Sequence, residues 1–255
     1  MSSMIPRKGP SWLGYEFKSP DELAAGVAER FVSLVKNDDH LRSVALSGGR
    51  ITEALFREIV SRSQALEKGL HHLNFFWADE RCVPLDNPAS NYRLARELLF
   101  EPLAIAPSQT FPFAGGETPS RMAELGRGML ERYFAASGVG RESLDLVFLG
   151  MGEDGHIASL FPENRASDLS RDELCYDVVA SKPPPNRITL SYPLLSAAKE
   201  VWLVISGEGK AAVLREALRS EGMSPIKELI TRREQTTLFT DISLDEFKLT
   251  VGDLS

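Results

Sequence analysis

The stretch Asp145–Pro162, DLVFLGMGEDGHIASLFP, decides how the rest of the chain is interpreted. Its apolar run at Leu146–Leu149 is typical of a strand that is buried on both faces. Glycines, two acids and His156 follow, and Pro162 stops a short apolar turn. Open α/β sheets place their ligand chemistry at the carboxyl ends of such strands. The stretch therefore predicts a buried strand with a functional loop, and the alternative is an ordinary polar loop built from common turn residues.

The composition is that of a soluble globular protein. The chain has 255 residues, a length that fits one α/β domain, with 43% hydrophobic and 25% charged residues. Its formal charge is −7 and it has no long basic run. This balance argues against nucleic acid or an anionic membrane as the main partner. An acidic protein can still bind an anion if its few basic residues converge in one cleft.

The cysteines and the N-terminus indicate a cytoplasmic protein. Cys82 and Cys175 lie far apart and form no CxxC motif, so neither a disulfide framework nor a metal site is expected. The start, MSSMIPRKGPSWLGYEF, lacks the apolar core of a secretory signal. No apolar run approaches the roughly 20 residues that span a bilayer.

Apolar spacing predicts alternating strands and helices along most of the chain. Residues 1–19 are expected to be an irregular N-terminal segment with an edge strand at Leu13–Phe17, and residues 20–255 a single α/β domain. This alternation predicts a mostly parallel sheet with helices on both faces. The expected strands are Ser43–Leu46, Leu73–Trp77, Asp145–Leu149, Tyr176–Ala180, Arg187–Ser191, Val201–Ile205 and Thr236–Thr240, and the expected helices are Pro20–Lys36, Ile51–Leu66, Asn91–Phe100, Ser120–Ala136, Lys210–Arg219 and Pro225–Ile230.

Four of the expected strands end in polar or glycine-containing turns. The turns are SGG at Ser47–Gly49, ADER at Ala78–Arg81, GMGEDGH at Gly150–His156 and SGEGK at Ser206–Lys210. The carboxyl ends of parallel strands lie along one edge of a sheet. We therefore expect these four turns to meet in one cleft.

Three of these turns carry groups that suit an anion. Ser47–Gly49 precedes a helix and can offer backbone N–H groups, although it matches neither the P-loop nor the GxGxxG pattern. Lys210 begins a helix, where the helix dipole disfavours a cation unless an anion lies between them. Together with Arg50, Arg81 and Arg187 it would form a basic patch that a phosphate-bearing ligand explains. The alternatives are a plain tight turn and solvated surface charges.

His156 is the histidine that stands in a glycine-flanked turn beside carboxylates, whereas the other three are most simply surface residues. Histidine exchanges a proton near neutral pH, and either Asp154 or Glu153 could orient its ring. The sequence has no HExxH motif and no GxSxG elbow. What is left is an enzyme that activates water without a metal or a covalent serine.

These motifs together resemble those of the 6-phosphogluconolactonase family. The similar segments are LSGG at Leu46–Gly49, WADERCVP at Trp77–Pro84, SNY at Ser90–Tyr92, GMGEDGHIASLFP at Gly150–Pro162, the PPxR-TLS pattern around Arg187 and SGxGKA at Ser206–Ala211. The resemblance implies hydrolysis of 6-phospho-D-glucono-1,5-lactone to 6-phosphogluconate in the oxidative pentose phosphate pathway. It also implies a modified Rossmann-like fold, shared with glucosamine-6-phosphate deaminases, and no cofactor.

The resemblance also implies site residues. His156 matches the histidine that is thought to activate water, and Asp79 and Arg81 match a segment that lines the sugar pocket. The residues that match the sugar- and phosphate-binding region are Gly48, Gly49, Arg187 and Lys210. The predicted catalytic residues are His156, Asp154 and Asp79, and the predicted substrate- and phosphate-binding residues are Ser47, Gly48, Gly49, Arg50, Arg81, Arg187 and Lys210. The expected partner is a small phosphosugar lactone, bound by a monomer without a metal.

One departure from the family pattern concerns the phosphate site. Many relatives read SGGSTP, but here Arg50 and Ile51 follow the glycines in place of the hydroxyl residues. Arg50 could bind the phosphate in a bidentate manner, or the anion could be displaced.

Two other readings are open. A glucosamine-6-phosphate deaminase typically continues FNEP after the histidine motif and carries DEY where this chain has Asp79–Arg81. A non-catalytic sugar-phosphate sensor is the other, and no DNA-binding segment precedes residue 20 to favour it.

Overall fold

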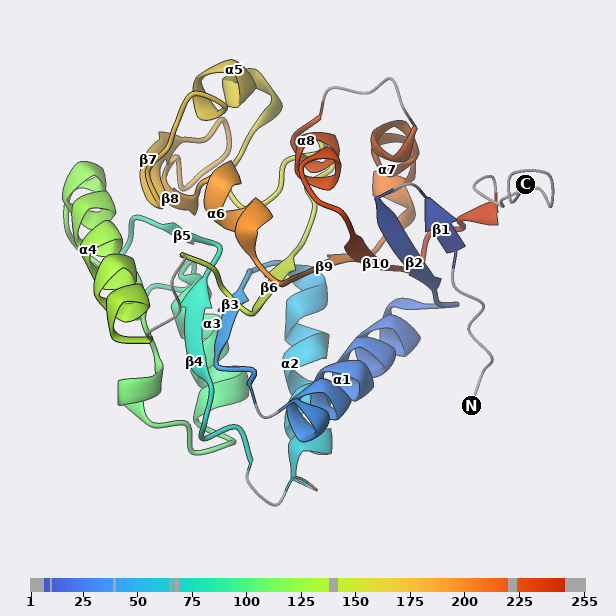
Figure 1. Ribbon diagram of the computed structural model, residues 1–255, viewed down its shortest axis with the longest axis horizontal. Helices are drawn as coiled ribbons and strands as arrows, with labels where there is room; N and C mark the ends of the chain where they lie inside the picture. The colour runs from blue at the N-terminus through green and yellow to red at the C-terminus, as the bar shows by residue number, and fades with distance from the viewer. Residues whose placement is uncertain are drawn as a thin grey trace.

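A mostly parallel sheet of seven strands forms the centre of the protein in a computed structural model, which describes residues 7–9, 11–38, 40–64, 66, 69–137, 142–219 and 224–245 (Figure 1). The strand order is β1-β2-β10-β9-β6-β3-β4, and every neighbouring pair is parallel except β1 and β2. These strands are β1 (Arg7–Gly9), β2 (Trp12–Glu16), β3 (Ser43–Leu46), β4 (Asn74–Trp77), β6 (Leu146–Leu149), β9 (Glu200–Ile205) and β10 (Thr236–Thr240).

A second, smaller sheet is antiparallel and has the order β5-β8-β7. Its strands are β5 (Asp79–Arg81), β7 (Cys175–Val179) and β8 (Asn186–Leu190). Ala78 alone separates β4 from β5, so the chain passes directly from the large sheet into the small one.

The helices surround both sheets, and none in the described part of the chain has the length and apolar content needed to cross a membrane. They are α1 (Pro20–Asn37), α2 (Arg50–Ser63), α3 (Asn91–Ala95), α4 (Pro119–Ser137), α5 (Arg165–Asp168), α6 (Tyr192–Ala197), α7 (Ala211–Leu218) and α8 (Pro225–Thr231). Four shorter segments complete them: the π-helical Arg96–Phe100 and the 3-10 turns Pro107–Gln109, Pro162–Asn164 and Glu208–Lys210.

The path of the chain places helices on both faces of the large sheet. The chain moves towards β4 when it passes from β2 through α1 to β3 and from β3 through α2 to β4. It moves the opposite way from β6 to β9 and from β9 through α7 to β10. Because such crossovers are right-handed, α1 and α2 share one face and α7 lies on the other. In Figure 1, α1 and α2 lie below the sheet and α7 and α8 lie above it.

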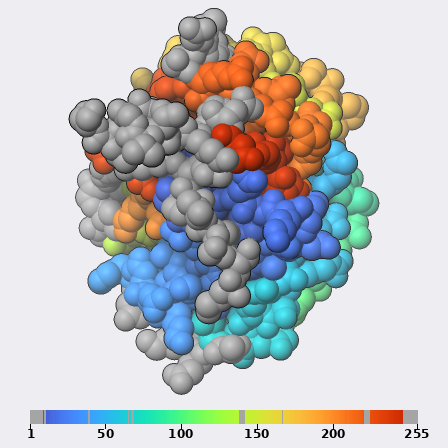
Figure 2. Space-filling view, turned by 90° about the vertical axis from the view of Figure 1, so that its right-hand side faces the viewer, coloured from blue at the N-terminus to red at the C-terminus, as the bar shows by residue number. Residues whose placement is uncertain are grey.

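The central strands are short and fully buried. Every residue of β3 (SVAL), β6 (LVFL) and β10 (TTLFT) is buried, which is the pattern expected where helices cover both faces of a parallel sheet. Near one end of the sheet, β2 pairs with β10, so the start and the end of the described chain lie side by side. Figure 2 shows blue N-terminal and red C-terminal segments in contact on this side of the molecule.

The start of α1 follows the sequence prediction. The Ser19 side chain caps the helix and accepts a hydrogen bond from the Glu22 backbone N–H, and Pro20 occupies the first turn. Acids in the first turn suit the helix dipole. The apolar positions of α1, among them Leu23, Val27 and Phe31, are buried against the sheet at helical spacing.

The structure differs from the expectations in several places. The strand expected at Leu13–Phe17 is present as β2, but it is no edge strand because β1 pairs along its outer side. The rest of the segment 1–19 was expected to be irregular, and it contains β1. The three residues of β1 pair through backbone groups and carry no apolar pattern that could have revealed them. Residues 1–6 and 10 of this segment, and 246–255 of the expected domain, lie outside the described residues. The expected helix at 91–100 becomes π-helical after Ala95.

The two strands expected near residues 176–191 are present as β7 and β8, but they join the small sheet rather than the parallel one. The apolar pattern that reveals a strand does not state its partner, because pairing depends on contacts distant in sequence.

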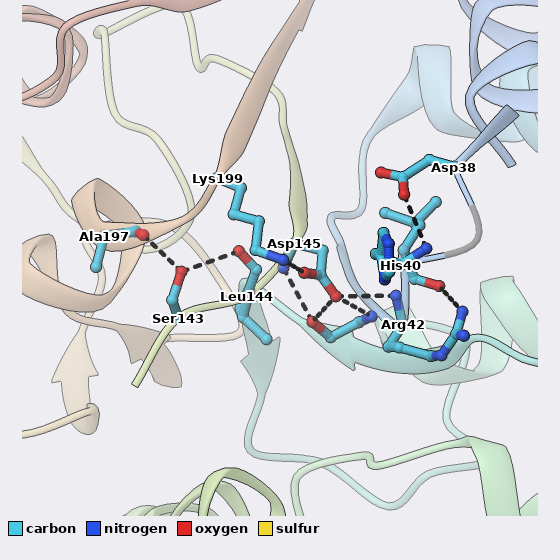
Figure 3. A network of polar contacts seen from close by, with 10 residues as sticks. Asp38, His40, Arg42, Ser143, Leu144, Asp145, Ala197 and Lys199 are labelled. Atoms are coloured by element: carbon cyan, nitrogen blue, oxygen red, sulfur yellow. Dashed lines mark hydrogen bonds and ion pairs between the residues drawn. The ribbon is translucent and has the colours of Figure 1, made fainter. Parts of the chain in front are cut away.

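Asp145 connects the beginnings of three strands of the large sheet. Its Oδ2 accepts hydrogen bonds of 2.9 Å from the backbone N–H groups of Arg42 and Ser43 and from the Ser43 hydroxyl. Its Oδ1 lies 2.6 Å from Nζ of Lys199, just before β9. Figure 3 shows Asp145 between Lys199 on one side and Arg42 on the other. Burial raises the pKa of this carboxyl, but Lys199 and these donors outweigh burial and hold the pKa below its ordinary value.

We expect the variant Asp145→Asn to lower the free energy of unfolding at pH 7 by about 2–4 kcal/mol, because it removes a partly buried, hydrogen-bonded charge and turns an N–H group towards backbone donors. Since the folded state lowers the pKa of Asp145, its contribution is present above the ordinary carboxyl pKa and is lost as the pH falls through the folded value. The difference between wild type and variant in urea unfolding should therefore narrow on acidification.

The matched control is Lys199→Met, which removes only the half-exposed partner and should cost about 1 kcal/mol or less. A control as damaging as Asp145→Asn, or a difference that grows in acid, would contradict this account.

Candidate active site

A cavity of about 350 Å³ opens at the carboxyl ends of the strands of the large sheet. The chain leaves β3 towards β4 on one side and returns on the other side as β6, so β3 and β6 flank the point where the strand order reverses. Open α/β sheets bind ligands at such a point. The cavity is lined by Ser47, Gly48, Gly49, Arg50, Ile51, Asp79, Arg81, Asn91, Gly150, Met151, Gly152, Glu153, His156, Ala158, Lys182, Arg187 and Lys210.

The four turns expected to converge do meet here. All of the site residues predicted from the sequence line the cavity except Asp154, which lies behind His156 and contacts its ring. Residues far apart in the chain, such as Gly48, Arg187 and Lys210, are brought together because their strands end on the same edge or on the adjoining small sheet.

His156 and Asp154 form a close pair. Nδ1 of His156 lies 2.5 Å from Oδ1 of Asp154, and the His156 backbone N–H donates to the same oxygen over 3.3 Å. Because a carboxylate only accepts hydrogen bonds, Nδ1 carries the hydrogen, and Nε2 of the neutral ring is left as a proton acceptor. The ring also packs on Phe161, with 4.8 Å between the two ring centroids. Asp154, rather than Glu153, is thus the carboxylate that orients the histidine.

The loop around this pair requires a glycine at position 152. A Cβ atom there would lie 2.2 Å from the His156 ring and 2.5 Å from Oδ1 of Asp154, which is closer than real contacts allow. The backbone N–H of Gly152 also donates to the His156 carbonyl over 2.9 Å. Burial raises the pKa of Asp154, but the charge and hydrogen bonds of His156 outweigh it and lower the pKa overall.

The small sheet supplies two arginines to the cavity. Arg81 on β5 and Arg187 on β8 are direct partners in the strand register. Nε of Arg187 donates to the Pro184 carbonyl over 3.0 Å, and its guanidinium lies over the ring of Phe161. Burial lowers the pKa of Arg187, with nearby Asp79 acting in the opposite direction. Arg187 is therefore a largely desolvated cation that the Pro184 carbonyl and the Phe161 ring hold in place.

Asp79, the first residue of β5, is buried and anchored by two neighbours. The Ser159 hydroxyl donates to its Oδ2 over 2.7 Å, and Nδ2 of Asn91 donates to its backbone carbonyl over 2.9 Å. The Ser159 contact fixes the direction of the carboxylate relative to the histidine loop, because Ser159 follows His156 closely in the chain, and the Asn91 contact holds the backbone of Asp79.

The turn after β3 presents backbone donors to the cavity. Gly49 is the N-cap of α2 with φ +120° and provides no side-chain cap. Its carbonyl accepts from the Thr52 N–H over 3.1 Å, and the N–H groups of Arg50 and Ile51 have no side-chain oxygen to cap them. The Ser47 hydroxyl, in contrast, donates to the Phe148 carbonyl on β6 over 2.8 Å. Ser47 therefore joins the two strands, and the glycines and the helix start face the ligand space.

Lys210 lines the cavity from the turn after β9, as the last residue of a 3-10 turn and the N-cap of α7. Burial lowers the pKa of its ammonium group and Arg50 lowers it further, whereas Glu153 and Asp241 raise it. Arg50, at the start of α2, is 94% exposed, and its Nη2 lies 3.7 Å from Oε1 of Glu153.

Asn91 and Lys182 are among the lining residues that the predicted site did not include. Asn91 begins α3, whose N-terminus is held by the buried Glu80: the carboxylate accepts from the backbone N–H groups of Asn91 and Tyr92, both over 2.8 Å. Burial raises the pKa of Glu80 despite these donors. The helix-start pattern SNY was a usable signal for Asn91, but no local pattern connects Lys182 to the cavity.

Comparisons with known proteins agree on one family. The model of the family described as glucosamine-6-phosphate isomerases/6-phosphogluconolactonase matches residues 18–239. A probable 6-phosphogluconolactonase 3, chloroplastic, from Oryza sativa subsp. indica is 35% identical over 210 residues, which are 78% of this chain and 64% of that protein. The 6-phosphogluconolactonase of Bos taurus is 34% identical, over 82% of this chain and 83% of that protein.

The fold gives the same result. The crystal structure of a 6-phosphogluconolactonase from Thermotoga maritima superposes with a TM-score of 0.74 and 25% identity, over 90% of this chain and 98% of that chain. The match spans less than two thirds of the length of the rice relative and nearly the full length of the bacterial one.

The packing of Asn91 on Gly48 predicts how sensitive the site is to a single methyl group. A Cβ atom at Gly48 would lie 2.0 Å from Oδ1 of Asn91, so we expect Gly48→Ala to displace Asn91 and to lower the free energy of unfolding by about 1–3 kcal/mol. Thermal unfolding and a crystal structure of the variant measure both effects.

Gly150→Ala is the matched control, because a Cβ atom there meets only the Gly48 carbonyl, at an ordinary 3.8 Å. Equal destabilisation by the two alanines, or an unmoved Asn91 in Gly48→Ala, would refute the argument.

Proposed function

This chain belongs to the glucosamine-6-phosphate isomerase/6-phosphogluconolactonase family, and we propose that it hydrolyses 6-phospho-D-glucono-1,5-lactone to 6-phospho-D-gluconate, a step of the oxidative pentose phosphate pathway. The observation that carries the proposal is the His156–Asp154 pair in a cavity that also holds several cations. The cations are Arg50, Arg81, Lys182, Arg187 and Lys210.

The cations account for the recognition of a phosphorylated substrate. The chain as a whole carries a formal charge of −7, so a cavity rich in Lys and Arg is a local reversal of sign. A phosphate dianion between the start of α2 and Lys210 would gain backbone donors, the helix dipole and a partly desolvated ammonium group. Binding energy from this remote group fixes the orientation of the lactone at the reacting carbon.

The chemistry needs one group that moves a proton. In the proposed reaction, Nε2 of His156 takes a proton from a water molecule as its oxygen attacks the lactone carbonyl carbon. The tetrahedral oxyanion then collapses, the bond from that carbon to the ring oxygen breaks, and the imidazolium returns the proton to the departing oxygen. Asp154 holds the ring through Nδ1 and stabilises the imidazolium while it lasts.

The small sheet would bind the rest of the substrate. Asp79 and Arg81 lie on β5, beside Arg187 on β8, and form a wall with one carboxylate and two guanidinium groups. A carboxylate suits sugar hydroxyls, and the guanidinium groups supply positive potential for the developing oxyanion. We assign Asp79 to substrate orientation, because Ser159 and Asn91 anchor it in one direction.

We infer further that the enzyme works as a cytoplasmic monomer without a cofactor. Both cysteines are free, which suits a reducing compartment. Val179 is the exposed large hydrophobic residue within the described part of the chain. The described surface therefore offers no broad apolar patch for a permanent partner.

The first test is a lactone hydrolysis assay with the spontaneous rate subtracted. Wild type should exceed the background, and His156→Ala should reduce kcat by about 10²- to 10⁴-fold, because it removes the general base. Circular dichroism spectra of both proteins serve as the folding control.

Wild-type activity at the background rate would refute the proposed function, and activity retained in His156→Ala would refute the role of the histidine. Release of ammonia from glucosamine 6-phosphate would instead assign the chain to the deaminase branch of the family.

The second test concerns Asp154. Asp154→Asn keeps the size of the side chain but loses the charge that orients and stabilises the histidine, so kcat should fall about 10- to 100-fold with little change in KM. Glu163→Gln is the control, since Glu163 is an exposed acid just after the same loop and does not line the cavity. A large rise in KM with kcat unchanged would show that Asp154 acts in binding instead.

A further inference from the structure

Glu153 places a negative charge in a cavity that otherwise suits an anion. Its side chain is 61% exposed and lines the cavity together with Arg50, whose Nη2 lies 3.7 Å away. Glu153 directly precedes Asp154 in the turn that carries the proposed catalytic pair, and backbone hydrogen bonds from Gly152 to His156 and from Gly155 to Gly152 close this turn around it.

The Glu153 carboxylate also lies near the turn that precedes α7. Its Oε1 lies 3.9 Å from the position that a Cβ atom of Gly209 would take, in the turn before α7. It also interacts electrostatically with Lys210, as Arg50 does. Glu153 therefore stands between the cation at the start of α2 and the cation at the start of α7, where the proposed function expects the phosphate.

This ion pair is open to competition. Arg50 and Glu153 are both largely exposed, and pairs of this kind contribute little stability. A phosphate dianion attracts Arg50 and Lys210 more strongly than a single carboxylate does. A bound phosphate would thus displace Glu153 from the cations but would still be repelled by its carboxylate.

The Glu153 carboxylate repels substrate and product to different extents. Hydrolysis converts the neutral ester of the lactone into a carboxylic acid, which releases its proton to water at neutral pH, so the product carries one negative charge more than the substrate. Since the new carboxylate forms next to His156, three residues from Glu153, the repulsion is greater for the product.

We propose that Glu153 is a specificity-determining residue that weakens binding of the more anionic product and so favours its release. The inference rests on the proposed function, because it uses the charge difference between lactone and hydroxy acid. Glu153 does not take part in the proton transfer. Its carboxylate repels the product more strongly than the substrate and so makes the product bind more weakly.

The test compares wild type with Glu153→Gln. Isothermal calorimetry with 6-phosphogluconate should give a Kd about five- to tenfold lower for the variant, whereas KM for the lactone should fall only about two- to threefold. The ratio of the wild-type Kd for 6-phosphogluconate to that of the variant should shrink towards one at about 0.5 M salt, because screening weakens repulsion between exposed charges. The control is Glu124→Gln on α4, which removes an acid of the same 61% exposure, also paired with an arginine, outside the cavity.

Several outcomes would overturn the inference: equal Kd values for wild type and Glu153→Gln, weaker binding by the variant, a ratio that does not respond to salt, or an equal effect of Glu124→Gln. Calorimetry requires no turnover, so these failures differ from failure of the proposed function, which the hydrolysis assay of wild type reports.

Discussion

The hydrogen-bonded carboxylate of Asp145 is the constraint on which the geometry of this protein depends. It holds the beginnings of β3 and β6, and through Lys199 the beginning of β9, at one edge of the sheet. The strands β3 and β6 are four residues long, or roughly 13 Å. Fixing their beginnings therefore also fixes where they end, which is where the glycine turns and the histidine loop start.

The charge around the cavity is opposite in sign to the net charge of the chain. An acidic protein concentrates arginine and lysine around one cavity. Backbone carbonyls hold Arg81 and Arg187, and Lys210 is partly buried, whereas the exposed Arg50 pairs with Glu153. Desolvated cations bind anions more strongly than solvated ones, since less water must be removed on binding. The acids that are present have separate tasks: Asp154 orients the histidine, Asp79 is anchored in the wall, and Glu153 faces the ligand space.

Much of the fold and part of the site could be predicted from the sequence, because the relevant signals are local. Buried runs such as Leu146–Leu149, helix caps such as Ser19 and the glycine turn before His156 each lie within a few residues. The small sheet could not be predicted, since β5 and β8 are more than 100 residues apart and nothing local states that they pair. The inclusion of Lys182 in the cavity and the pairing of Arg50 with Glu153 depend in the same way on where distant loops fold.

Ala78 belongs to both sheets at once, and this has a mechanical consequence. Its N–H donates to the Leu46 carbonyl of the large sheet and its carbonyl accepts from the Leu190 N–H of the small sheet, both over 2.8 Å. The residue is fully buried. Ala78 therefore connects the small sheet, which carries the arginines, to the edge of the large sheet, which carries the histidine loop. A hinge motion between the two sheets at this residue would break both hydrogen bonds. The exposed side chains at the cavity, such as Arg50 and Glu153, can instead open a path for the ligand by rotation, which is a faster and more local motion than the movement of a domain.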